Sequence, residues 1–461
     1  MTQQVTSPRE QSQHQAYPGQ EPPISRKGII SLLVIIGMLL LLFVGLVIRN
    51  LPQAVAVHHD ASSRTRVGQA TVQAQDTPPS LQAPGNTSAA PLQLPVGHYL
   101  LYEQQNNIYL VSTSGGVPQL LTTPGYIYNR AVPPIITSTG QLLYSGDGLW
   151  VTDIFGGTPV QIATLLPMQV ITSMVLSSDG TTVAWSTEPA NGDGSISIYA
   201  GPISGASLVY QQSSEDCPCF RIFSFLNGSG QKGDTTLMLT DDRGDHHAVQ
   251  YGLWTLDLTK VGESGPQPLL DEEPQQGPLA LVPYGNTLLY SSYEGVVPAP
   301  TDGSAPMDID ALSYANSLYM TTINQQPLTL ATPQVILPEQ HSLPNSAEYH
   351  WVTTPLFSLD GHTLVYIVFS SDAQAPFDRH SAMYSVQIKG SGSQLSLGKP
   401  QLLATSTSRF VELGVWLNDH ILTFYADNNL YAIDIHTGAV TTIVETKAYA
   451  RIIAVVGHSL G

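Results

Sequence analysis

The side chains best able to do chemistry in this sequence are carboxylates, and they gather in four stretches. Residues 187–195, 240–250, 293–315 and 371–380 hold eleven acidic residues against two arginines, a net charge of −9 where the whole chain carries −18. Grouped carboxylates attract cationic partners, and they also ligate the divalent metals that assist hydrolysis. The candidate binding residues are Asp241, Asp242, Asp245, Asp302, Asp308, Asp310, Asp372 and Asp378.

Two other sets of donor atoms give weaker signals. His246 and His247 adjoin three of these aspartates and could ligate a metal, but a solvated loop is the simpler interpretation, and the sequence leaves any metal unknown. Cys217 and Cys219 are the only cysteines, and a disulfide between residues two apart closes a small, strained ring. A disulfide, two loop thiols and a metal or redox role all stay open for this pair.

The familiar catalytic motifs are either absent or lack the neighbouring residues that they require. Residues 457–461 read GHSLG and fit the G-x-S-x-G pattern, but a nucleophile elbow needs a following helix and a later acid and histidine, which do not follow Ser459 in this sequence. The zinc motif H-E-x-x-H, paired C-x-x-C motifs and the Gly-Lys-Ser/Thr order of a phosphate loop are absent. We therefore expect no catalytic residue and no cofactor.

The acidic stretches alternate with a repeated β-hairpin, which must position them. FSLDGHTLVY (357–366) places a Ser-Leu-Asp-Gly turn between two short apolar strands, and VLSSDGTTVAWS (175–186) repeats the pattern with Ser-Ser-Asp-Gly. Glycine adopts the positive φ of a tight turn, and Ser and Asp bond to nearby backbone. Each hairpin is followed by an aromatic-containing strand, a Gly-bearing turn and a last strand. Four short strands per repeat are typical of a propeller blade.

These repeats resemble a known family. FSLDGHTLVY and IYLVSTSGGVPQLLT (108–122) are similar to the WD40-like repeats of TolB-type β-propellers, which also occur in the propeller domains of prolyl oligopeptidase-like enzymes. The resemblance spans roughly residues 99–456 and implies an all-β propeller with an interaction function. The family's own partners do not transfer, because this chain carries a predicted anchor and no recognisable second TolB domain.

The repeats predict seven four-stranded blades within a propeller domain at 96–461. The first and last parts of this domain, three strands before residue 122 and one at 448–456, complete a seventh blade by pairing the two ends, which removes exposed sheet edges. A ring of six or eight blades is the alternative. The other six blades are predicted at 133–166, 171–212, 219–271, 277–337, 353–405 and 411–445.

The strand order places the acidic stretches together. Strands alternate in direction within a blade, so the loops between second and third strands emerge on the same face as the connections between blades. All four acidic stretches are such loops, and we call this side the long-loop face. The opposite side, the short-turn face, carries turns that are close to neutral.

The N-terminal part predicts a membrane anchor. Residues 28–48 are uncharged and apolar, and 21 helical residues span about 31 Å, the thickness of a bilayer core. We expect 1–27 to be a disordered cytoplasmic tail, and 49–95, rich in Ala, Pro, Gln, Ser and Thr, to be a flexible linker. The predicted protein is therefore single-pass in the cell membrane, with the propeller extracytoplasmic. The alternative is a cleaved signal peptide, which the length of the apolar run disfavours.

These features favour a binding module without catalysis. We expect a protein, peptide or cell-envelope ligand, including cationic ones, to bind through the acidic long-loop face. One alternative is a propeller hydrolase with metal-assisted carboxylates on the same face. Another is a single-pass sensor whose tail contacts a cytoplasmic partner. Nucleic acid is disfavoured because the net charge of −18 repels phosphates.

Overall fold

The computed structural model describes the part of the chain that begins at Leu94. The described ranges are 94–121, 132–155, 157–190, 194–215, 218–226, 235–241, 251–271, 276–283, 285–292, 317–338, 348–372, 375–390, 396–408 and 411–458. All of them belong to the second of two units, Met1–Gln82 and Ala83–Gly461. The predicted tail, apolar helix and nearly all of the linker lie outside these ranges. Within them, no helix has the length and apolar character needed to cross a membrane.

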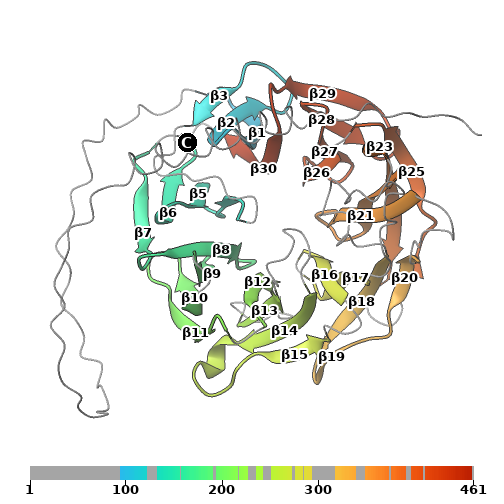
Figure 1. Ribbon diagram of the computed structural model, residues 1–461. Coiled ribbons are helices and arrows are strands. Elements are labelled where there is room, and N and C mark those ends of the chain that lie inside the picture. Colours follow the sequence, from blue (N-terminus) through green and yellow to red (C-terminus); the bar gives the residue numbers. More distant parts are fainter. Residues whose placement is uncertain are drawn as a thin grey trace, which may run out of the picture. The chain divides into compact units, whose positions relative to one another are not determined.

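Seven antiparallel sheets form the domain, arranged around a common centre (Figure 1). Blade 1 contains β4 (Ile135–Ile136), β5 (Gln141–Ser145), β6 (Gly148–Asp153) and β7 (Val160–Thr164). Blade 2 contains β8 (Gln169–Leu176), β9 (Thr182–Pro189), β10 (Ser195–Pro202) and β11 (Ser207–Ser213). Blade 3 contains β12 (Phe220–Phe225), β13 (Thr236–Asp241), β14 (Tyr251–Asp257) and β15 (Gln267–Leu270), with the 3₁₀ turn η1 (Leu258–Lys260) after β14.

The remaining blades continue the ring. Blade 4 contains β16 (Gln276–Leu281), β17 (Thr287–Ser292), β18 (Leu318–Gln325), β19 (Leu328–Leu330) and β20 (Gln334–Leu337). Blade 5 contains β21 (Glu348–Phe357), β22 (Thr363–Asp372), β23 (Ala375–Lys389), β24 (Ser396–Leu397) and β25 (Gln401–Ser406). Blade 6 contains β26 (Val411–Trp416), β27 (Ile421–Ala426), β28 (Asn429–Asp434) and β29 (Val440–Glu445). Blade 7 contains β30 (Ala450–His458), β1 (Gly97–Gln104), β2 (Asn107–Ser112) and β3 (Gln119–Leu121).

The predicted all-β propeller with seven blades is confirmed, including the pairing of the two ends of the domain. Strand β30 pairs with β1 from Gly97↔His458 to Gln104↔Ala450, so blade 7 combines both ends. The prediction of four strands fails only in blades 4 and 5, which have five. There the third strands, β18 and β23, each pair with two short strands in succession along their length.

Hydrophobic clusters join each blade to the next. The seven clusters of buried side chains each draw on two successive blades, so that every interface in the ring has its own core. Aromatic rings on second and third strands stack within blades, as in Trp185 on Tyr199, with ring centroids 5.2 Å apart, and Tyr366 on Tyr384, at 5.6 Å. The aromatic strands of the sequence repeat therefore supply these cross-strand pairs.

The Ser-x-Asp-Gly turns form one hydrogen-bonding pattern at two places. The hydroxyl of Ser177 donates to Asp179 Oδ1 (2.7 Å) and accepts from the backbone N–H of Thr182 (2.9 Å). In the second turn Ser358 donates to Asp360 Oδ1 (2.5 Å) and accepts from the N–H of Thr363 (2.8 Å). The turn residues predicted from the sequence thus close the first hairpin of blades 2 and 5.

Glycine is required in these turns for two reasons. Gly361 has φ +72°, and a Cβ there would lie 2.6 Å from Val282 Cγ2 in the neighbouring blade. We expect Gly361→Ala to lower the free energy of unfolding by about 1–2 kcal/mol from the left-handed backbone alone, and by more because Val282 must move. Urea denaturation measures this. Gly205→Ala is the control, since a Cβ there would have no atom within 4 Å apart from its chain neighbours. Equal stability of the two variants would contradict the expectation.

The raised pKa values of two buried tyrosines predict how the free energy of unfolding changes at alkaline pH. Burial, and secondarily Tyr384, raises the pKa of Tyr366 from 10.0 to about 12; burial and Tyr109 do the same for Tyr102. The unfolded chain releases these protons near pH 10 while the folded chain holds them, so this stabilisation is complete below pH 10 and is lost as pH rises from 10 to about 12. The urea concentration at the unfolding midpoint should decrease as the pH is raised from about 9 to about 11.5, and Tyr366→Phe should make that decrease smaller. A constant wild-type midpoint would refute this.

Candidate functional site

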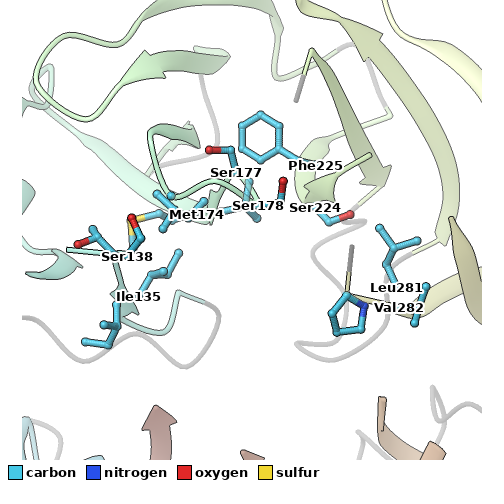
Figure 2. Close-up of a pocket in the computed structure, with 15 residues that line it drawn as sticks. Ile135, Ser138, Met174, Ser177, Ser178, Ser224, Phe225, Leu281 and Val282 are labelled. Atoms are coloured by element: carbon cyan, nitrogen blue, oxygen red, sulfur yellow. The ribbon is translucent and has the colours of Figure 1, made fainter. Parts of the chain in front are cut away.

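A pocket of about 570 Å³ lies where the first strands of four successive blades end on the short-turn face. Strands β4, β8, β12 and β16 and the turns after β4, β8 and β16 supply its lining, which we call the inner pocket. Figure 2 shows labelled side chains of all four strands or their turns around this space. Its apolar lining includes Ile135, Met174, Phe225, Leu281 and Val282.

Serine hydroxyls supply the polar part of the inner pocket. Ser138 and Ser178 are exposed in the turns after β4 and β8. Ser224 lies near the end of β12, and its Oγ is buried with no hydrogen-bond partner in the described structure. A buried hydroxyl without a partner costs free energy, and a bound ligand could provide the missing hydrogen bond.

The lining of the inner pocket is suited to uncharged ligand groups. None of the described residues that line it carries a charged side chain, so the lining combines hydroxyls with apolar surface. Such a lining desolvates apolar ligand groups and orients them with a few hydrogen bonds. The sequence repeats predicted strands and turns of this kind, but not that the strand ends of four blades, with three of their turns, would enclose a space.

The long-loop face is described in part. Asp302, Asp308, Asp310, Asp242 and Asp245 lie outside the described ranges, and Asp378 is described only as a backbone position in β23. Asp372 is exposed at the end of β22. Asp241, expected on the acidic rim, is instead 1% exposed, and its Oδ1 accepts a 2.6 Å hydrogen bond from the backbone N–H of Cys219. This carboxylate therefore helps to hold the segment entering β12.

An arginine that the sequence interpretation missed reduces the negative charge of this face. Arg221, at the start of β12, forms a 3.5 Å ion pair with Glu188 at the end of β9. Both residues are at least partly buried, and the pair joins blades 3 and 2. Glu188 is one of the eleven acids counted in the loops, so the field of the long-loop face depends on the others.

The remaining predicted donors are not brought together in the described structure. Cys219 is half-buried, and Cys217, His246, His247 and Ser459 fall in undescribed segments, so the disulfide, metal and nucleophile alternatives stay untested. Among the residues that are described, no three His, Cys, Asp or Glu side chains form a group that could hold a metal ion.

The similarity of this chain to known proteins is limited to the fold. No family model and no curated protein matches the chain. Similar solved structures include an oligogalacturonate lyase in complex with manganese, with 15% identity, 76% of this chain and 86% of that chain covered, and TM-score 0.46. Another is a putative TolB from Agrobacterium tumefaciens, with 14% identity, coverages of 78% and 99%, and TM-score 0.38. The ring of seven sheets confirms the propeller fold that the TolB-type resemblance implied. Similarity this distant assigns no site and no activity to this chain.

Proposed function

We propose that this protein is a membrane-tethered, extracytoplasmic binding propeller that captures a protein, peptide or cell-envelope ligand without catalysing a reaction on it. In this proposal residues 28–48 anchor the chain, 1–27 remain in the cytoplasm and 49–95 link the anchor to the propeller. The apolar length of 28–48 supports the anchor, and the composition of 49–95 supports the tether.

The observation that carries the binding role is the inner pocket. It is preformed by rigid strand ends of four blades, and it combines apolar walls with the unpartnered Ser224 hydroxyl. Preformed concave sites of several hundred Å³ with a few polar groups are typical of ligand-binding sites. An uncharged lining supplies hydrogen bonds and desolvation, which are sufficient for binding.

The acidic long-loop face is a second candidate surface for the same function, suited to a cationic ligand. The net charge of −9 in the four loops supports it, whereas the burial of Asp241 and the pairing of Glu188 reduce the number of available carboxylates. The two surfaces occupy opposite ends of the blades, so variants can separate them. A metal-assisted hydrolase acting on the long-loop face remains the alternative function.

Affinity capture from native membranes with the full chain tests the proposal. Ser178→Trp is designed to fill the inner pocket, and the turn should tolerate a large residue because Leu359 occupies the matching position of the second Ser-x-Asp-Gly turn, where it is 54% exposed. The acidic-face variant changes Asp242, Asp302, Asp308 and Asp310 to Asn. Thr441→Trp, on the exposed part of β29, is the matched control.

We expect a species captured by the wild type and by Thr441→Trp to be lost with Ser178→Trp. Loss only in the acidic-face variant would move the site to the long-loop face. Equal capture by all four chains, or capture by none, would refute the binding proposal and favour a screen for metal-dependent hydrolysis.

A further inference from the structure

A second pocket lies between blades 1 and 2, separate from the inner pocket. It has a volume of about 380 Å³ and is lined by β7, the segment leading into β8, and side chains of β9, β10 and β11. It shares no lining residue with the inner pocket, so its role does not depend on the function proposed for that site. We call it the interblade pocket.

One residue that lines the interblade pocket, Gln169, has a polar atom without a partner in the described structure. Gln169 donates from Nε2 to the backbone carbonyl of Ser195 (3.4 Å), which fixes the orientation of its amide. Its Oε1 is buried and has no hydrogen-bond partner in the described structure. The missing partner is a donor, because a carbonyl oxygen can only accept.

A second side chain in the lining, the hydroxyl of Ser197, is arranged to donate. Ser197 is 4% exposed, and its Oγ accepts a hydrogen bond from Gln211 Nε2 at 3.2 Å. With the amide occupying an acceptor position, the hydroxyl hydrogen of Ser197 can be directed to another acceptor. Gln169 therefore needs a donor while Ser197 can supply one. An alcohol group on a ligand can satisfy either need.

Aromatic and aliphatic surface completes the pocket. Trp185 and Tyr199 stack at 5.2 Å with their planes 12° apart, and Tyr199 is half-buried. Leu166 lies on the wall formed by the segment leading into β8 and is 67% exposed. A large exposed leucine beside an aromatic pair offers apolar contact to a ligand whose faces carry C–H groups.

We propose that the interblade pocket binds a neutral saccharide. A sugar ring carries hydroxyls that donate and accept at its rim and C–H groups on its faces, which matches the lining. No described lining residue is charged, so the pocket has no counter-charge for a uronate or a phosphate. The main competing ligand is a peptide that adds to the free edge of β7 or β11, the outer strands of their sheets, and the hexapeptide comparator below tests for it.

The test uses the full chain, purified without glycoside detergents, and titration calorimetry with neutral trisaccharides of glucose, mannose, galactose and N-acetylglucosamine. Trigalacturonate and a Ser/Gln hexapeptide are the comparators. Gln169→Leu removes the unpartnered carbonyl, and Ser197→Ala removes the donor. Gln401→Leu, exposed on β25, is the matched control. Thermal unfolding confirms that each variant is folded.

We expect at least one neutral trisaccharide to bind, and both pocket variants to weaken that binding about tenfold or more while Gln401→Leu leaves it unchanged. If Gln169→Leu does not fold, Ser197→Ala gives the same readout. Absence of binding by every neutral trisaccharide, or equal affinity in the folded pocket variants, would overturn the proposal. Preference for trigalacturonate or for the hexapeptide would overturn it as well.

Discussion

A chain lacking residues 450–458 is expected to lose its cooperative unfolding transition. These residues form β30, which pairs with β1 along the full length of β1. Without β30 the edge of β1 is exposed, together with the core side chains Leu100 and Leu101, which are 0% exposed in the closed ring. Folded domains have free energies of unfolding of about 5–15 kcal/mol, and we expect the loss of a whole strand and of parts of two interblade cores to exceed that.

Thermal unfolding followed by circular dichroism and calorimetry measures this effect. A chain lacking only 459–461 is the control and should keep the wild-type transition. A cooperative transition of wild-type midpoint in the chain without β30 would contradict the closure of the ring through blade 7.

The second large effect is expected for Trp351→Ala in blade 5. Trp351 is 2% exposed, the largest of the fully buried side chains, and it stacks on Phe369 with centroids 5.1 Å apart in the core shared by blades 5 and 6. Removing a buried aromatic side chain leaves a cavity and costs about 3–5 kcal/mol. Urea denaturation should therefore show a free energy of unfolding lower by about that amount.

Trp150→Ala is the matched control for this substitution. Trp150 is only partly buried, and its indole N–H donates to Asp147 at the surface (2.9 Å). Its loss should cost clearly less than the loss of Trp351. If both variants lose the same free energy, the interface between blades 5 and 6 is not the tightly packed core described above.

The architecture could be predicted from sequence because local signals repeat. Gly180 and Gly361 each mark a turn that only a few residue types can form, and the apolar strands around them alternate with period two. Six repeats of this kind, with three strands before them and a lone strand after them, predict a ring of seven blades and its closure. The five-stranded blades were missed because the repeats mark one outer strand per blade, whereas β18 and β23 each pair with two short strands in succession.

The candidate site was less accessible to sequence reasoning. Ser224 is one of many serines in the chain, and only the folded ring shows that it lines a pocket and is left without a partner. A sequence also shows which residues are charged but not how deeply they are buried. Asp241 was therefore expected on the acidic rim, although it is buried beside the segment entering β12. Arg221 was missed because it belongs to no recognisable sequence motif, and its pairing with Glu188 depends on the contact between two blades.

Site-specific photo-crosslinking tests the central claim most directly. A photoreactive phenylalanine analogue replaces Ser178 in the inner pocket of the full chain in native membranes, and a second chain carries it at Thr441. The binding proposal predicts a discrete adduct at position 178, identifiable by mass spectrometry, and none above background at 441. No adduct at 178, or the same adducts at both positions, would contradict the claim that the inner pocket binds a ligand.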